Sequence, residues 1–438
     1  MFQSVDHCDH RKRLLAKLQQ NEAVLVFGAP TRRRSGDSDY RYRPHSDLFW
    51  LSGWEAPQCA ALLRPGSEEP FVLFVQARDP VREVWEGRRP GPEGAVEQYG
   101  ADAAFEFGEI EAELPRLLEG VSALHYQFAV DPDHDAVLMA SVNRAARAAR
   151  QKGTAYPQTF HLFDKVVHEL RLRKTANELA IMREAAALTD RGHRAAMAFT
   201  RPGVHEYEVE AVLTQPWRRG GSTGDAYTPI VATGDNATVL HYNTNRDVCQ
   251  DGELLLIDAG CEVAYYACDV TRTYPVNGRF TPAQRDLYEV VLAAQLASID
   301  RCRAGSSFND VHHTAVHTLT EGMVAIGLLE GSVDELIESG GFRKYYTHST
   351  SHWLGLDVHD VGTYSKDGAV RDLAPGIVLT VEPGLYVPNS DETAPEAFRG
   401  MGIRIEDDVH VTDGDPEVLT AAIPKTIDEI EAACAIVA

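Results

Sequence analysis

The sequence predicts a two-domain α/β protein, and three observations lead to that expectation. Its 438 residues exceed what one hydrophobic core usually supports. Short apolar runs typical of strands alternate with amphipathic stretches typical of helices. Near residue 172 a capping sequence opens a long amphipathic run, which places the expected domain boundary between residues 1–171 and 172–438.

The first domain is expected to be a smaller α/β unit. Strands are predicted for the apolar runs 23–27 and 71–75, which are bounded by turn residues. Helical patterns follow at 108–119 and 133–150. The polar, proline-containing stretch 151–158 then interrupts the pattern.

The second domain begins with a predicted helix cap. In the segment Thr175 to Glu178, the threonine hydroxyl and the glutamate carboxylate can satisfy free N–H groups of a first helical turn. The helix that follows is predicted over 179–199, before an Arg-Pro-Gly sequence that ends it. Further helices are predicted at 204–219, 281–304 and 307–327.

Composition restricts the class of partner. Acidic residues outnumber basic ones by 65 to 42, and the formal net charge of −23 disfavours binding to nucleic acid or to anionic membranes. Residues 1–13 lack the apolar core of a signal peptide, and no stretch approaches the roughly 18 apolar residues of a membrane span. Seven cysteines without a CxxC pair indicate reduced thiols. We therefore expect a cytoplasmic protein with no nucleic-acid or membrane partner.

Two carboxylates are expected to lie side by side. Asp258 ends the apolar run 254–257, where an ionised group is costly unless it is paired or bound to a metal. Asp269 is predicted on an alternating strand, 265–273, which a hairpin over 261–264 would bring back to Asp258. Two adjacent carboxylates repel each other unless a proton or a cation lies between them, and a metal is the simplest resolution.

Three later segments add candidate ligands. Glu382 ends the apolar run 378–381, and Glu406 shares a predicted strand face with Arg404 because side chains alternate along a strand. His352 lies among glycines and small residues, which favours a loop and strand over a helix. A single acid at a strand end is more often a turn residue than a ligand. Several such acids together are typical of a metal site.

The combined donor set indicates the kind of metal. Four carboxylates and one imidazole provide too few nitrogens and no sulfur for a typical structural zinc site. The set suits manganese(II), cobalt(II) or iron(II), with manganese(II) our first expectation and zinc(II) a further alternative. Two ions are expected, because four negative groups overcharge one cation. The sequence thus predicts a dinuclear-metal hydrolase with five ligands: Asp258, Asp269, His352, Glu382 and Glu406.

At these residues the chain resembles the pita-bread metallopeptidases, specifically the aminopeptidase P branch. The matching stretches are 34–40, 46–53, 257–262, 269–278, 351–360, 379–386 and 402–408. The resemblance covers nearly the whole chain. It implies a creatinase-like N-terminal α/β domain followed by a pita-bread catalytic domain.

The resemblance also implies an activity, the removal of an N-terminal residue from peptides whose second residue is proline. Asp258 would bind one ion, Asp269 and Glu406 would bridge both ions, and His352 and Glu382 would complete the second site. A water or hydroxide between the ions would attack the scissile carbonyl. Glu382 would carry a proton from this nucleophile to the leaving nitrogen.

Further residues match substrate-contacting positions of the family. His241 matches a substrate-side histidine. His359 matches the histidine that stabilises the tetrahedral intermediate or the departing prolyl nitrogen. His348, Tyr386 and Arg404 match positions that line the pocket for proline and the residues beyond it.

Two features concern subunits and specificity. Asp37 and Trp85 match residues that reach a neighbouring subunit's active site, so a homodimer or homotetramer is expected. Ser349 follows His348 where the family usually has glycine. If that position needs positive φ, serine imposes strain that alters substrate preference and leaves the metal ligands intact.

Alternative functions stay open at this point. A prolidase restricted to Xaa-Pro dipeptides would share the fold, although segments 34–39 and 402–408 favour the aminopeptidase. A catalytically silent binding protein, or a metal-free relative such as creatinase, would lack several ligands. A methionine aminopeptidase is disfavoured by the additional domain at 1–171. The histidine pair His313 and His317 suggests a second metal site, but a solvated helix face is the preferred interpretation.

Overall fold

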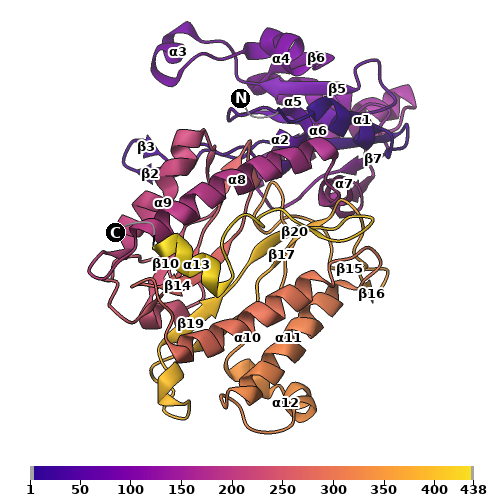
Figure 1. Ribbon diagram of the computed structural model, residues 1–438. Helices are drawn as coiled ribbons and strands as arrows, with labels where there is room; N and C mark the ends of the chain where they lie inside the picture. The colour runs from indigo at the N-terminus through magenta and orange to yellow at the C-terminus, as the bar shows by residue number, and fades with distance from the viewer. Residues whose placement is uncertain (1–3, 436–438) are drawn as a thin grey trace. The chain divides into compact units, whose positions relative to one another are not determined.

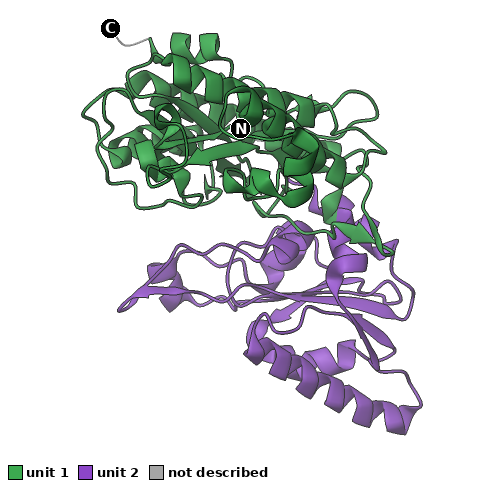
Figure 2. Ribbon diagram, turned by 90° about the horizontal axis from the view of Figure 1, so that it is seen from below, with its two compact units in different colours: residues 1–4, 171–438 green, residues 5–170 purple. Residues whose placement is uncertain are grey.

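The computed structural model describes residues 4–435, which form two compact units (Figure 2). Unit 2 comprises Val5–Leu170, and unit 1 comprises residues 171–435 together with Ser4. Within residues 4–435, every helix is too short or too polar to span a membrane.

Unit 2 is built on a mixed sheet with strand order β6-β5-β4-β1-β7-β8. β1 pairs antiparallel with β4 and parallel with β7. Leu25 and Phe74 from this sheet pack with Leu114 and Leu138 from α5 and α6 in one buried core. The strands are β1 (Glu22–Phe27), β2 (Arg33–Ser35), β3 (Ser38–Asp39), β4 (Ala60–Leu63), β5 (Phe71–Val75), β6 (Ala103–Glu106), β7 (Ala123–His125) and β8 (Thr159–His161). The helices are α1 (His7–Leu15), α2 (Ser46–Ser52), α3 (Pro80–Glu86), α4 (Gly91–Tyr99), α5 (Ile110–Leu117) and α6 (Pro132–Lys152).

Unit 1 combines several small sheets with long helices, among them α8, α10 and α11 (Figure 1). Its sheets have strand orders β10-β11-β14, β13-β12-β9, β17-β20-β21, β18-β19 and β15-β16. The strands are β9 (Gly224–Asp225), β10 (Ile230–Thr233), β11 (Leu254–Asp258), β12 (Cys261–Val263), β13 (Tyr266–Ala267), β14 (Thr271–Pro275), β15 (Ser365–Lys366), β16 (Ala369–Val370), β17 (Val378–Val381), β18 (Gly384–Val387), β19 (Met401–Arg404), β20 (Asp407–His410) and β21 (Glu417–Val418). The helices are α8 (Ala176–Phe199), α9 (Glu206–Gly220), α10 (Pro282–Ile299), α11 (Phe308–Ala325), α12 (Val333–Ser339) and α13 (Ile427–Cys434), with α7 (Val167–Leu172) at the division between the units.

The predicted cap of α8 is confirmed. The Glu178 N–H donates to the Thr175 hydroxyl at 3.2 Å, and the Thr175 N–H donates to the Glu178 carboxylate at 2.8 Å. These reciprocal bonds satisfy two N–H groups that have no partner within the helix, so α8 begins at Ala176. The other predicted helices are also present, with ends that differ by a few residues. α10, for example, ends at Ile299 rather than 304.

The continuous strand predicted over 265–273 is wrong. β12 and β13 form a hairpin that turns at Ala264 and Tyr265, where φ is 46° and 65°, and β14 begins only at Thr271. Asp269 therefore lies between two strands. Its N–H donates to the carboxylate of Asp408, at 3.3 and 3.2 Å, rather than to a neighbouring strand.

Candidate metal centre

Three carboxylates meet where β11 and β14 pair. Asp258 is the last residue of β11 and lies opposite Thr271, whose hydroxyl donates to Glu406 Oε2 at 2.7 Å. The hydroxyl of Tyr227 lies 2.6 Å from Asp258 Oδ1 and 2.5 Å from Asp269 Oδ1. The Tyr227 hydroxyl thus links Asp258 to Asp269, and the Thr271 hydroxyl holds Glu406 on the strand that pairs with Asp258.

His352 and Glu382 approach this group from the neighbourhood of β17. Nδ1 of His352 lies 3.0 Å from the carbonyl oxygen of Trp353, so Nδ1 carries the proton and Nε2 is the nitrogen available to a ligand. Nε2 lies 3.4 Å from Asp269 Oδ2 and 3.6 Å from Glu382 Oε1. One ligand atom from each of Asp269, His352 and Glu406 lies within 4.8 Å of the other two. This spacing fits a shared cation.

The electrostatics of the group favour bound cations. Burial raises the pKa of Glu382 to about 7, against the positive charges of His352 and Arg404. Burial and the nearby Asp269 hold the pKa of Glu406 well above its ordinary value. Burial would lower the pKa of His352, but the hydrogen bond and charge of Asp269 raise it to about 9. Because these acids retain protons in the absence of a cation, the oxygen-rich donor set fits divalent ions that would replace those protons.

A hydrogen-bonded chain forms one wall of the site. Arg404 donates to Asp258 Oδ2 at 2.5 Å and to the hydroxyl of Tyr386 at 3.0 Å. That hydroxyl lies 2.8 Å from Nε2 of His348, while Nδ1 of His348 lies 2.8 Å from the carbonyl oxygen of Ser349. Burial lowers the pKa of His348 to about 4, so the ring is neutral and accepts at Nε2. Ser349 is not among the non-glycine residues of the described chain with positive φ, and the strain considered above does not arise.

A cavity of about 610 Å³ adjoins these groups. Nine of the predicted site residues line it: His241, Asp258, Asp269, His348, His352, His359, Glu382, Arg404 and Glu406. The ring of His359 meets that of His352 edge to face, with centroids 4.3 Å apart. Tyr386 is buried beside the cavity through its contacts with His348 and Arg404. The other two predicted residues, Asp37 and Trp85, are exposed residues of unit 2.

Comparisons with known proteins agree with this geometry. The profile of metallopeptidase family M24 matches residues 180–413, and that of the aminopeptidase P N-terminal domain matches residues 7–125. An Xaa-Pro aminopeptidase of Escherichia coli is 42% identical over 424 residues, which cover 96% of each chain. The chain belongs to metallopeptidase family M24. The prediction of the aminopeptidase P branch is confirmed.

Solved structures support the same family. An aminopeptidase of Pseudomonas aeruginosa matches with a TM-score of 0.96 and 44% identity, over 99% of both chains. A zinc-substituted aminopeptidase P of E. coli in complex with product matches with a TM-score of 0.94 and 40% identity, over 99% of both chains. The predicted fold, an aminopeptidase P N-terminal domain followed by an M24 pita-bread catalytic domain, is confirmed, and the chain is a hydrolase of the metallopeptidase class.

Tyr227 is a residue of this M24 site that the sequence did not reveal. Tyr227 lies in the loop before β10, which begins at Ile230. Its contact with two carboxylates depends on tertiary structure, and the only local signal is its position after the glycine-rich segment 220–224.

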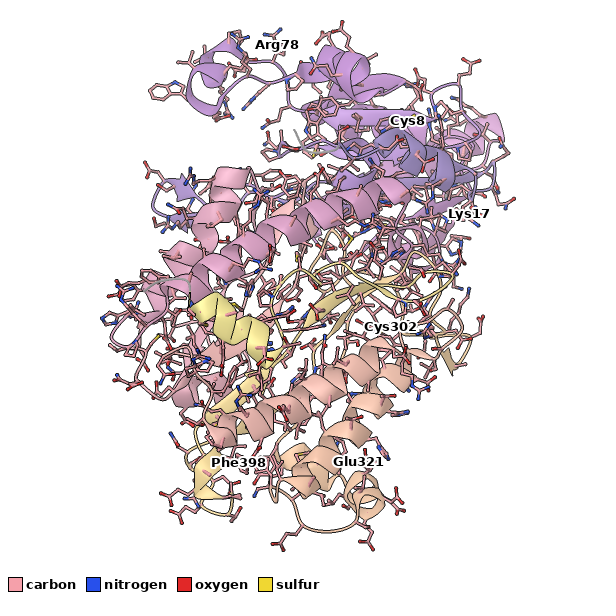
Figure 3. All side chains as sticks on the ribbon, in the orientation of Figure 1. Cys8, Lys17, Arg78, Cys302, Glu321 and Phe398 are labelled. Atoms are coloured by element: carbon pink, nitrogen blue, oxygen red, sulfur yellow. The ribbon has the colours of Figure 1, made fainter. Side chains whose placement is uncertain are left out.

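Two further residues have side chains that could bind metal or react, but their surroundings indicate other roles. Cys268 is fully buried, and burial raises the pKa of its thiol well above the ordinary value, as suits a packing residue. His317 on α11 pairs with Glu321 at 3.4 Å on an exposed helix face (Figure 3). Among residues 4–435, the cluster with metal-binding geometry is the one that contains Asp269, His352 and Glu406.

Proposed function

We propose that the chain is a dinuclear-metal exopeptidase that hydrolyses the bond between an N-terminal residue and a following proline. The observation that carries the proposal is the convergence of five metal-ligand candidates and a rigid polar wall on one cavity. Xaa-Pro aminopeptidases of E. coli and Haemophilus influenzae, 42% and 39% identical over almost the full length, support it.

Five residues would hold two manganese(II) ions. Asp258 would bind one ion, Asp269 and Glu406 both, and His352 and Glu382 the other. Bound there, the ions would supply an activated water and polarise the scissile carbonyl. Glu382, which lines the same cavity with its carboxylate 3.6 Å from Nε2 of His352, would accept a proton from the water and deliver it to the leaving nitrogen.

Recognition of proline would rest on shape and on neutral histidines. An Xaa-Pro bond has no N–H, so the site must identify a rigid ring rather than a hydrogen-bond donor. Arg404 fixes Tyr386, which in turn fixes His348, and this wall would receive the ring. Burial lowers the pKa of His359, which leaves a neutral ring to contact the scissile bond, with His241 on the substrate side of the same cavity.

Peptides longer than two residues are the proposed substrates. The cavity, about 610 Å³, lies within the range of about 300–1,000 Å³ that encloses drug-sized ligands, so residues beyond proline have room. Ile230, Leu240 and Val358 contribute apolar lining that a peptide continuing past proline would contact.

The experiment measures how peptide hydrolysis depends on bound metal and on proline at the second position of the substrate. We expect hydrolysis of an Xaa-Pro-Xaa peptide to stop when a chelator removes metal and to return when manganese is added. The same peptide with alanine in place of proline serves as the control for specificity. Activity that survives complete metal removal would contradict the metal proposal, and turnover confined to Xaa-Pro dipeptides would move the assignment to prolidase.

We further propose a cytoplasmic homodimer or homotetramer. Val81, Val84 and Trp85 on α3 are 74%, 80% and 85% exposed and recur at helical spacing, which is typical of a face that another chain covers. All seven cysteines are free, as expected in a reducing compartment. Light scattering should give two or four times 48.3 kDa, and Trp85→Ala should shift the equilibrium toward monomer. A wild-type protein that is monomeric at all concentrations would contradict the proposal.

A further inference from the structure

Behind the candidate ligands lies an arginine with no exposed surface. Arg272, on β14, is 0% exposed. Its Nη1 donates to the carbonyl oxygen of Glu406 at 2.6 Å and to that of Thr271 at 2.9 Å. Its Nε donates to the carbonyl oxygen of Pro424 at 2.9 Å, and its Nη2 to that of Ile423 at 3.2 Å. One guanidinium thus joins the main chain of a candidate ligand to a turn near the C-terminus.

A buried carboxylate completes this arrangement. Asp407, also 0% exposed, accepts from Arg272 Nη2 at 2.7 Å. It also accepts from Gln295 on α10, from the hydroxyl of Thr420 and from Nζ of Lys425, each at 2.7 Å. These partners are side chains from three parts of unit 1, namely β14, α10 and the turn 420–425, so the position of the carboxylate is strongly constrained.

The Arg272–Asp407 pair is connected to the candidate metal ligands Glu406 and Asp269 through neighbouring residues and hydrogen bonds. Glu406 precedes Asp407 in the chain, and its side chain accepts from the hydroxyl of Thr271, whose carbonyl Arg272 holds. Asp408 follows Asp407 and accepts from the N–H of Asp269. The main chains of the two residues expected to bridge the ions are thus both linked to the Arg272–Asp407 pair, directly for Glu406 and through Asp408 for Asp269.

We propose that Arg272, Asp407 and Lys425 are positioning residues that hold Glu406 and Asp269 at the separation two metal ions require. Through Lys425 and the carbonyls of Ile423 and Pro424, the turn 420–425 contributes to metal affinity although it does not line the cavity. This inference rests on the proposed metal-dependent function. Partners that orient metal ligands from behind typically change affinity by about 10–100-fold when they are replaced.

Arginine is required because its planar fork reaches several acceptors at once. A lysine at position 272 keeps the positive charge but offers one nitrogen in place of three, so it cannot hold both the Glu406 carbonyl and Asp407 in the present geometry. Arg272→Lys therefore tests position separately from charge. Lys425→Met tests the remote end of the network, because it keeps the length of the side chain and removes one donor from Asp407.

The measurement is calorimetric titration of metal-free protein with manganese chloride, at a temperature where circular dichroism shows each variant folded. We expect Arg272→Lys to raise the dissociation constant about 10–100-fold and Lys425→Met to raise it by a smaller factor. Lys344→Met is the matched control, since Lys344 makes a comparable 2.8 Å ion pair with Asp391 away from the cavity. At saturating manganese, kcat and KM of both network variants should return to near wild-type values, because the network does not touch substrate.

The outcomes separate this inference from the proposed function. Wild-type affinity in both folded network variants would overturn the inference while leaving the proposed function intact. Equal weakening in Lys344→Met would overturn it as well, because the effect would then be general. A wild-type protein that binds no manganese would overturn the proposed function and the inference with it. If Arg272→Lys fails to fold, Lys425→Met and Thr420→Val carry the same comparison.

Discussion

Replacing Glu382 by glutamine should lower kcat by about 10²–10⁴-fold, the usual contribution of a general acid–base group. The Glu382 carboxyl lines the cavity, and burial raises its pKa to about 7. That value applies to the metal-free protein; with cations bound, the carboxylate would be ionised and able to accept a proton from the attacking water. Glutamine preserves the size of the side chain and one oxygen donor but cannot carry the proton. The measurement is kcat on an Xaa-Pro-Xaa peptide at saturating manganese.

Metal content must be measured alongside, because Glu382 is also a candidate ligand. Glu417→Gln is the control: its carboxylate accepts two hydrogen bonds of 2.7 Å from Arg183 outside the cavity, so kcat should change less than about two-fold, as is usual for surface changes. If Glu382→Gln retains full metal occupancy and more than a tenth of the wild-type kcat, the proton-transfer role is wrong.

The sequence was most informative where a site residue ends an apolar run. The runs before Asp258 and Glu382 become β11 and β17, and each acid lies at the end of its strand, where it lines the cavity. Around Glu406 the side chains do alternate, since Ile403 and Ile405 are fully buried while Arg404 and Glu406 line the cavity. The single strand predicted there is wrong, because β19 ends at Arg404 and β20 begins at Asp407, which leaves Glu406 between two strands. Local periodicity is sufficient in such segments because the side-chain direction is set by the strand.

Sequence reasoning was least informative where the chain approaches itself closely. A Cβ at Gly260 would lie 1.8 Å from the carbonyl oxygen of Cys268, so only glycine fits there. The backbones at residues 260 and 268 are therefore in direct contact, which a pattern of alternating side chains does not predict. Because of this close contact and the turn at Ala264 and Tyr265, Asp269 lies outside the strands β13 and β14. No spacing rule reveals such an approach, because it depends on tertiary packing.

The run Glu406-Asp407-Asp408 shows the same limit in three adjacent acids. The sequence presents them as one acidic motif, yet Glu406 lines the cavity, Asp407 binds Arg272, and Asp408 accepts the N–H of Asp269. The alternation of side chains predicts that Glu406 and Asp407 point to opposite sides. It does not predict which acid binds metal and which one positions a metal ligand. That distinction depends on partners more than 100 positions away in the chain.

Replacing Asp269 by asparagine should raise the dissociation constant for manganese by more than roughly 100-fold, beyond the effect of losing a partner behind the ligands. Asp269 is the carboxylate nearest to Nε2 of His352, and both belong to the three-residue cluster with metal-binding geometry. The asparagine amide lacks the negative charge with which Asp269 would balance the charge of the manganese ions. Calorimetric titration measures the loss, and peptide hydrolysis should disappear with it. Asp391→Asn, at an ion pair away from the cavity, should bind manganese as the wild type does.

The pH dependence of the metal-free protein provides an independent test of the same contact. Asp269 raises the pKa of His352 to about 9 against the opposing effect of burial, whereas an unfolded histidine titrates near about 6.5. Stabilisation by this pair is therefore complete below about pH 6.5 and is lost as pH rises through 9. Burial raises the pKa of Glu382 to about 7 and holds the pKa values of Glu406 and Asp408 well above their ordinary range, so these acids add declines of the same sign. The contribution of His352 is therefore measured by comparison with Asp269→Asn, which removes its carboxylate partner. The melting temperature of metal-free wild type and of Asp391→Asn should fall by several degrees as pH rises from about 6.5 to about 9. A melting curve for Asp269→Asn that runs parallel to that of the wild type would show that Asp269 does not hold the proton on His352. The charge balance inferred for the five candidate ligands would then be wrong.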